Sequence, residues 1–178
     1  MKELSLHILD IVTNSIDAGA NLIEIEVKAD TKKNYLRINI KDNGKGMSKE
    51  TVEKVTNPFF TSRKVRNVGL GLPFLKLAAE QCDGFLKIQS EENIGTEVTA
   101  EFKLNHIDRA PLGKIEESIS TILNFHQNFD LIYIHDVNGK RFVFDTNEVK
   151  EILEDLSIRS PKVLMWIKDY IKENIDKI

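Results

Sequence analysis

The chain has 178 residues, of which 30% are charged and 41% hydrophobic, and its formal net charge is −3. A chain of this length can bury a sizeable core in one or two compact domains. The charge balance lacks the strong basic excess that is typical of nucleic-acid-binding proteins. Because Cys82 is the only cysteine, an intramolecular disulfide and a metal site built on paired cysteines are both excluded. No apolar run approaches the roughly 20 residues of a membrane span. The N-terminus lacks the basic and then apolar residues of a signal peptide. We therefore expect a cytoplasmic protein.

The first half of the chain predicts a compact mixture of helices and strands. Apolar residues recur at helical spacing over residues 4–18, and Gly19 can end that helix. Alternating apolar and charged residues then predict two half-buried strands, the second of which ends in the turn sequence Asp42-Asn43-Gly44. Further elements are expected over residues 49–55 (helix), 71–82 (helix), 85–90 (strand) and 97–104 (strand). This order predicts an α+β fold in which a mixed sheet is covered by helices.

The second half is expected to be a smaller α/β extension. The segment before Gly113 contains Pro111 and lacks periodicity, so we divide the chain into residues 1–105 and 106–178. A helix over 115–125, a hairpin turning at Asn138-Gly139 and two further helices are expected beyond it. This part forms either a small domain or an extension packed on the first. The apolar stripe of its last helix packs on its own domain or faces a protein partner.

The first helix carries a polar stripe opposite its apolar side. A rotation of about 100° per residue places five polar residues within one arc. Such a stripe is either a solvated face or one wall of a binding site. The residues are Glu3, His7, Asp10, Asn14 and Asp17.

Two glycine-containing segments point to a ligand that approaches the backbone closely. Asp42 to Met47 places a carboxylate at the end of an apolar strand, followed by Gly44 and Gly46. Residues 69–72, Gly-Leu-Gly-Leu, precede a helix and can offer backbone N–H groups to a phosphate. Neither the dinucleotide-binding fingerprint nor a Walker A sequence occurs. Each segment alone is also compatible with an ordinary turn.

Taken in order, these segments resemble the GHKL superfamily of ATP-binding domains, which includes DNA gyrase B, the MutL mismatch-repair protein, a large heat-shock chaperone and sensor histidine kinases. Residues 10–20 resemble the N box, most closely that of MutL, and residues 42–47 resemble the G1 box. Residues 58–63 and 69–72 resemble the F and G2 boxes of histidine kinases, and Gly95-Thr96 resembles the final Gly-Thr motif. The resemblance covers residues 4 to about 104 and implies the Bergerat fold, a two-layer α/β sandwich.

The resemblance also implies roles for individual residues. Asn14 would coordinate Mg²⁺ through its amide oxygen, and Asp42 would accept the adenine amino group of ATP. Arg63 and Lys64 would neutralise phosphate charge, although they are equally compatible with an exposed basic pair. The implied ATP-binding residues are Asn14, Asp17, Asp42, Gly44, Gly46, Met47, Thr61, Ser62, Arg63, Lys64, Gly69, Leu70, Gly71, Leu72 and Thr96.

Two departures from the family pattern bear on activity. MutL-like and gyrase-like ATPases carry a glutamate one helical turn before the asparagine, as the base that activates water, whereas this sequence has Asp10. The shorter side chain predicts slow or absent hydrolysis. His7 lacks the sequence pattern of a phosphoacceptor histidine and is expected either to support the residues that contact the nucleotide or to be structural. We expect the other histidines, His135 among them, to lie at the surface or in linkers.

Three functions follow from these observations. The first is a GHKL-type ATPase, or a protein kinase that transfers the γ-phosphoryl group to a separate partner, as anti-sigma-factor kinases do. The second is a non-catalytic switch that presents a nucleotide-dependent surface. The third is a MutL-like role in DNA repair, which the lack of a basic excess disfavours. ATP and Mg²⁺ are the expected ligands, and the C-terminal extension is the expected site of a protein partner.

Overall fold

The computed structural model describes residues 2–56 and 71–178. In chain order its elements are α1 (Leu4–Asp17), β1 (Leu22–Asp30), β2 (Tyr35–Asp42), α2 (Lys49–Val55), α3 (Gly71–Gln81), β3 (Phe85–Glu91), β4 (Gly95–Lys103), α4 (Ile115–Phe125), β5 (Asp130–Val137), β6 (Lys140–Asp145), α5 (Thr146–Leu153) and α6 (Pro161–Asp176).

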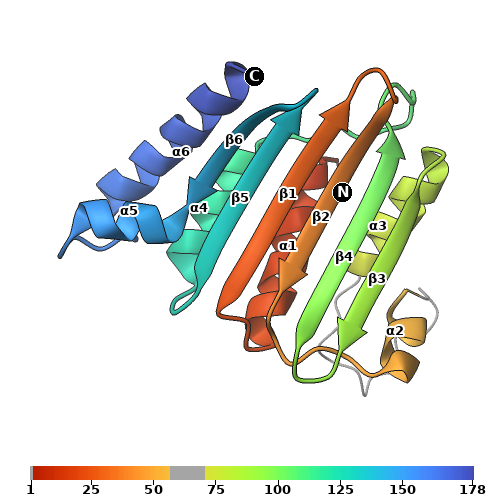
Figure 1. Ribbon diagram of the computed structural model, residues 1–178, viewed down its shortest axis with the longest axis horizontal. Helices are drawn as coiled ribbons and strands as arrows, with labels where there is room; N and C mark the ends of the chain where they lie inside the picture. The colour runs from red at the N-terminus through yellow and green to blue at the C-terminus, as the bar shows by residue number, and fades with distance from the viewer. Residues whose placement is uncertain (1, 57–70) are drawn as a thin grey trace.

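All six strands belong to one sheet, in the order β3-β4-β2-β1-β5-β6. Neighbouring strands are antiparallel except for β1 and β5, which run parallel. Figure 1 shows α1, α3 and α4 behind the sheet, which makes two layers. The structure therefore confirms the predicted α+β sandwich with a mixed sheet. Among the described helices, none combines the length and the continuous apolar surface that a bilayer span requires.

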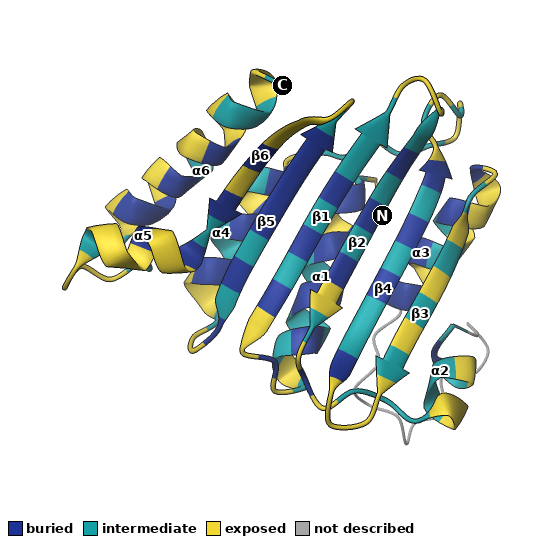
Figure 2. Cartoon of the chain, in the orientation of Figure 1, coloured by how far each residue is buried: buried dark blue, intermediate teal, exposed yellow. Residues whose placement is uncertain are grey.

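The alternating strands predicted from the sequence have one face toward the helices and one toward solvent. In β1, Ile23, Ile25 and Val27 are buried, while the residues between them are only partly buried. The same banding of buried and less buried residues follows β2 and β4 in Figure 2. On the face toward solvent, the open face of the sheet, Arg37 of β2 forms a 2.6 Å ion pair with Glu101 of β4. The core thus lies between the sheet and the helices.

α1 runs through the middle of the helix layer, between α3 and α4. Its apolar side is buried, as the spacing predicts, with Leu4 and Val12 fully inaccessible. On the α4 side, Ser118 donates a hydrogen bond to the Ser5 carbonyl at 3.2 Å. Of the polar stripe, His7 and Asp10 face α3, whereas Glu3 accepts a hydrogen bond from the Lys114 N–H at the start of α4. This position holds one wall of the candidate site in place, because the helix packs on three sides.

The hairpin of the C-terminal half extends the same sheet. β5 and β6 pair in the register expected for a turn at Asn138-Gly139, and both residues have positive φ angles. β5 in turn pairs with β1 from Leu22 opposite Asp130 to Ala29 opposite Val137. Residues after 106 therefore complete the sheet rather than form a separate one.

His135 is buried, and the expectation that it lies at the surface is wrong. Only 6% of the residue is exposed, and its Nδ1 atom lies 2.6 Å from the hydroxyl of buried Tyr133. The reason is topological: β5 is an interior strand with β1 and β6 on its sides, and Figure 2 shows a continuously buried stretch in its C-terminal half. Burial lowers the pKa of His135, and the carboxylate of Asp136 only partly opposes this effect.

The buried His135 predicts that the protein loses stability in mild acid. The unfolded chain takes up a proton near pH 6.5, whereas the lowered pKa keeps the folded form neutral. The free energy of unfolding should therefore fall as the pH drops below about 6.5, until the histidine also titrates in the folded state. Urea denaturation between pH 8 and pH 5 measures this slope.

The His135→Gln variant provides the control for this prediction. It should show a shallower dependence on pH, even though its stability at pH 8 is lower. His7, which is 2% exposed and whose pKa is also lowered by burial, contributes a further slope of the same sign, whereas the raised pKa of Asp10 contributes one of opposite sign. A slope that is equally steep in the variant would contradict the assignment to His135.

Candidate functional site

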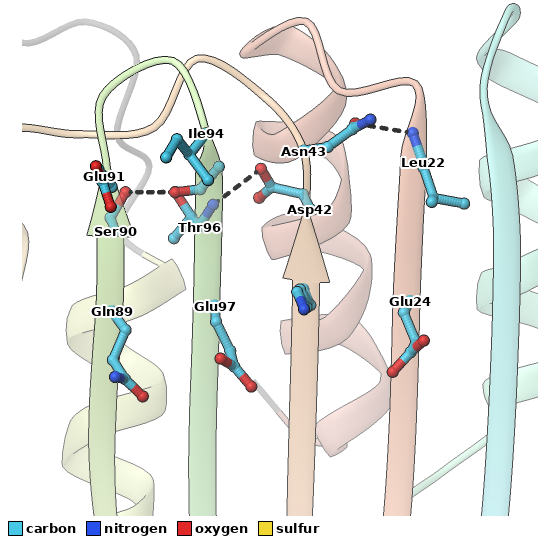
Figure 3. Close-up of a pocket in the computed structure, with 12 residues that line it drawn as sticks. Leu22, Glu24, Asp42, Asn43, Gln89, Ser90, Glu91, Ile94, Thr96 and Glu97 are labelled. Atoms are coloured by element: carbon cyan, nitrogen blue, oxygen red, sulfur yellow. Dashed lines mark hydrogen bonds between the residues drawn. The ribbon is translucent and has the colours of Figure 1, made fainter.

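The carboxylate of Asp42 joins three elements at one end of the sheet. Asp42 is the last residue of β2 and points to the helix side, in register with the buried residues of that strand. Its Oδ2 atom accepts a 2.6 Å hydrogen bond from the Ser15 hydroxyl of α1. Its Oδ1 atom accepts from the backbone N–H groups of Gly44 at 2.8 Å and Thr96 at 3.3 Å. Figure 3 shows Asp42 beside Thr96 at neighbouring strand ends.

The loop after Asp42 is held against β3 and β4 by backbone contacts that require glycine. Gly46 has a φ of +65°, and a Cβ atom there would lie 1.9 Å from the Glu91 carbonyl oxygen. Gly95 has a φ of +142°, and a Cβ atom there would lie 2.0 Å from the Asp42 carbonyl oxygen. Such distances leave no space for any side chain. The glycines of the G1-like segment and of Gly95-Thr96 thus bring the two segments together.

Ser90 is a site residue that the sequence analysis missed. Its hydroxyl accepts a hydrogen bond from the Met47 N–H at 2.8 Å and lies 2.8 Å from the Thr96 hydroxyl. It also donates to the Gly95 carbonyl at 3.0 Å. The signal that the sequence offered for Ser90 was the alternation of β3, which turns this side chain inward near the end of the strand. Ser15 was missed in the same way, although it directly follows Asn14 and lies on the buried side of α1.

A second group of predicted residues meets where α1 faces the start of α3. The Asn14 amide nitrogen lies 3.5 Å from the Asp10 Oδ2 atom. The Gly71 backbone also hydrogen-bonds the Asp10 carboxylate, and a Cβ atom on Gly71 would lie 1.8 Å from Oδ2. Burial raises the pKa of Asp10, while the hydrogen bonds from Asn14 and Gly71 oppose the rise. Of the predicted phosphate-binding residues, Gly71 therefore faces Asp10, and Leu72 is buried.

Two consecutive residues of α1 link the two groups. Ser15 contacts Asp42, while Asn14 contacts Asp10, so the helix connects the carboxylate at the sheet end to the polar stripe. Asp17, which was also expected in the site, is exposed at the end of α1. It makes no hydrogen bond or ion pair with either group within the described residues.

His7 lies on the same stripe, one turn before Asp10, and is 2% exposed. Within the described residues, its Nδ1 atom has no hydrogen-bond partner. Burial lowers the pKa of His7, and the Gly71 backbone only partly opposes this effect, which favours the neutral form of the ring beside Asp10. Thr61, Ser62, Arg63, Lys64, Gly69 and Leu70 lie outside the described residues.

Two hollows flank this constellation. One, of about 370 Å³, lies between α1 and α3 and is lined by His7, Asp10 and Gly71 together with apolar residues of α3. The other, of about 500 Å³, shares Asp42 and Thr96 but opens on the face of the sheet away from the helices, where Figure 3 shows Glu24 and Glu97. The first hollow thus adjoins the group around Asp10 and Gly71, and the second adjoins the group around Asp42 and Thr96.

The described side chains form no closed metal centre. Within residues 2–56 and 71–178, no group of three or more histidine, cysteine, aspartate or glutamate side chains could hold a metal. Asn14 offers an amide oxygen, because its nitrogen faces Asp10. Mg²⁺ in nucleotide sites keeps several waters and phosphate oxygens and needs few protein ligands. The residues therefore fit a magnesium ion that arrives with a nucleotide.

The chain resembles a solved structure in fold and matches one family model in sequence. A solved structure described as the N-terminal domain of a DNA repair protein superposes with a TM-score of 0.55 and 16% identity, over 89% of this chain and 59% of that chain. At this identity the likeness is one of fold. The family model of histidine kinase-, DNA gyrase B-, and HSP90-like ATPases matches residues 2–106. The chain belongs to this family.

Curated relatives in the same family are bacterial kinases. The sensor histidine kinase YvrG of Bacillus subtilis is 32% identical over 98 residues, which are 53% of this chain and 17% of the relative. Sporulation kinase C of the same organism is 31% identical over 94 residues, 53% of this chain and 22% of the relative. The sensor histidine kinase ZraS of Escherichia coli is 28% identical over 110 residues, 62% and 23%. The chain spans less than a quarter of the length of each of these kinases.

Proposed function

We propose that this protein binds Mg-ATP between α1, α3 and the end of the sheet. It would act as a slow ATPase or as a protein kinase that phosphorylates a separate partner. The observation that carries the proposal is the pair of consecutive residues Asn14 and Ser15, which connects the Asp42 carboxylate to the Asp10 carboxylate. ATP needs two recognition points of this kind, one for its adenine group and one for its phosphate chain. Membership of an ATPase family supports the same assignment.

Asp42 is the proposed adenine anchor. An ionised carboxylate is an acceptor only, and one that is already held by Ser15, Gly44 and Thr96 is fixed in orientation before a ligand arrives. Its remaining lone pair would accept the adenine amino group. Met47 and Thr96, which Ser90 joins by hydrogen bonds, would line the base. Recognition by prearranged groups costs little ordering entropy on binding.

The proposed phosphate end lies at the other side of Asn14. Its amide oxygen would hold Mg²⁺, which would neutralise phosphate charge when bound. The start of α3 would contribute the positive end of its helix dipole and the Leu72 N–H, whereas the Gly71 N–H would become available only on leaving the Asp10 carboxylate. Arg63 and Lys64 are proposed to add positive charge from the preceding segment.

Asp10 is the proposed general base. Burial raises the pKa of its carboxyl, which makes the carboxylate a better proton acceptor than an exposed aspartate. It would take the proton from an attacking water or from the hydroxyl or imidazole of a protein substrate. Its hydrogen bonds to Asn14 and to the Gly71 backbone hold it beside the proposed phosphate end.

The Asp10→Asn variant tests this role. If Asp10 is the base, the variant should form ADP at least about 100-fold more slowly than the wild type, with its affinity for ATP changed by less than about threefold. ADP formation is measured by a coupled assay, with and without a candidate protein substrate, and affinity by titration calorimetry.

The dependence on pH provides the control. Because the base must be ionised, turnover by the wild-type protein should rise with pH through the raised pKa of Asp10 and then level off. The variant should lack this acidic limb. If the two proteins turn over equally at every pH, Asp10 is not the base.

A non-catalytic switch is the second proposal, and the position of Asp10 favours it. The aspartate carboxylate is drawn back toward α1 by Asn14 and covered by Gly71. A nucleotide would then separate α3 from α1 and change the exposed surface without being cleaved. ATP binding with no ADP formation, together with different proteolysis patterns for the ATP-analogue and ADP complexes, is the result expected of this function.

A further inference from the structure

β3 and β6 are the two edge strands of the sheet that the described residues form. β6 pairs with β5 on one side, and no strand of residues 2–56 or 71–178 pairs with its other side. An edge of this kind presents backbone N–H and C=O groups that can pair with another strand. Figure 1 shows β6 at the border of the sheet, with α6 beyond it.

α6 contacts β6 from the helix layer and leaves an aromatic surface exposed. Phe142 points into that layer, where its ring lies 5.7 Å from the ring of Tyr170. Tyr170 in turn stacks on Trp166 at 5.1 Å. Trp166 is 48% exposed and its neighbour Met165 is 61% exposed. Large apolar side chains grouped beside an open sheet edge indicate an interaction surface.

We propose that the partner at this edge is a second copy of the same chain, paired antiparallel through β6. A two-fold axis perpendicular to the sheet leaves every side chain on the face of the sheet that it already occupies. Residues that lie opposite each other across the new strand pair therefore share a face. An axis through Val143 places Arg141 of each copy opposite Asp145 of the other on the open face. It also places Phe142 opposite the second copy's Phe144 on the helix side. The result is one continuous sheet across both copies.

Charge complementarity selects this register. Arg141 and Asp145 are the charged residues of the open face of β6, and the axis through Val143 pairs them twice by symmetry. An axis through Phe142 would instead place Arg141 opposite Val143, which leaves the guanidinium against an apolar side chain. Arg141 forms no ion pair within the described residues, although Asp136 lies opposite it on β5. Opposite charges directly across a strand pair stabilise that pairing.

The same symmetry accounts for the exposed aromatic surface. The α6 helices of the two copies would approach each other beneath the paired strands, with Trp166 and Tyr170 of each copy facing the seam. Burial of these rings would supply apolar contact area that strand pairing alone lacks. The C-terminal half would then serve as the dimerisation part of a nucleotide-binding protein.

A disulfide cross-link tests the proposed register directly. Residues opposite each other in an antiparallel pair have Cα atoms about 5 Å apart, within reach of a disulfide. The Val143→Cys variant of the full chain should therefore form a covalent dimer under mild oxidation, seen by non-reducing electrophoresis. The native Cys82 is 2% exposed and contributes no background. Lys87→Cys, on the opposite edge strand β3, is the matched control and should remain uncross-linked.

Sedimentation velocity over a range of concentrations measures the association itself. The wild-type protein should have twice the mass of one chain, and Arg141→Glu should raise the dimer dissociation constant by about tenfold or more. Arg141→Glu combined with Asp145→Arg should restore it. This rescue distinguishes a contact between copies from damage to the fold, since Asp145 also caps α5 through the Asn147 N–H.

A wild-type chain that stays monomeric at every concentration would overturn the proposal and leave the edge to a strand of a different protein. A dimer in which Val143→Cys does not cross-link, or in which Arg141→Glu has no effect, would also overturn it, because the copies would then meet elsewhere.

Discussion

The Asp42→Asn variant is expected to bind ATP about 100-fold more weakly than the wild-type protein. The substitution is nearly isosteric. Its amide oxygen can still accept from Gly44 and Thr96, and its amide nitrogen can donate to the Ser15 hydroxyl. At the proposed adenine position, however, a donor would replace an acceptor and meet the adenine amino group, which is itself a donor. A site built around a hydrogen bond rejects a mismatched partner strongly.

Titration calorimetry with ATP measures this loss, and Ser15→Ala is the matched control. That variant removes one hydrogen bond to the Asp42 carboxylate but keeps the carboxylate. Its affinity for ATP should fall by less than about tenfold. Circular dichroism should show that both variants remain folded. Equal affinity in Asp42→Asn and the wild type would remove Asp42 from the proposed adenine site.

The Gly46→Ala variant is expected to lower the free energy of unfolding by about 3 kcal/mol or more. Two costs add: a non-glycine residue at positive φ costs roughly 1–2 kcal/mol, and the new Cβ atom would lie 1.9 Å from the Glu91 carbonyl oxygen. Because that oxygen belongs to the backbone of β3, the clash is relieved only if the loop moves away from the strand. The movement would also break the hydrogen bond from Met47 to Ser90.

Gly139→Ala separates the two costs. Gly139 also has a positive φ, +87°, but no atom lies within 4 Å of a Cβ atom built there. This variant should lose only about 1–2 kcal/mol. Urea denaturation of both variants provides the comparison. If they lose the same free energy, the close approach of the Gly46 loop to β3 contributes nothing to stability.

Periodicity was sufficient to predict the elements of the fold because each strand has one buried face. The alternation of Ile23, Ile25 and Val27 predicted β1, and Asn138-Gly139 predicted the hairpin turn. The position of that hairpin in the sheet was not predictable in the same way. The parallel pairing of β1 with β5 joins residues about 100 positions apart, and no local pattern encodes such a contact. The burial of His135 follows from that pairing and was therefore missed.

The candidate site was predictable where a motif names the residue type. Asp42, Asn14 and the glycines carry the family resemblance, and the structure brings each beside its neighbours in the proposed site. Ser15 and Ser90 carry no such signal, because a serine on a buried face is common and its hydrogen-bond partners come from distant strands. The contact between Asp10 and Gly71 also joins two separate motifs, and only the packing of α3 on α1 reveals it.

Nucleotide binding by the wild-type protein and the Asn14→Ala variant, compared with and without Mg²⁺, tests the central claim most directly. We expect the wild type to bind ATP only weakly when Mg²⁺ is chelated and at least about tenfold more tightly when it is present. The Asn14→Ala variant should bind ATP weakly in both conditions while remaining folded. If the wild-type protein binds no ATP in the presence of Mg²⁺, or if Asn14→Ala responds to Mg²⁺ as the wild type does, the proposed nucleotide site is contradicted.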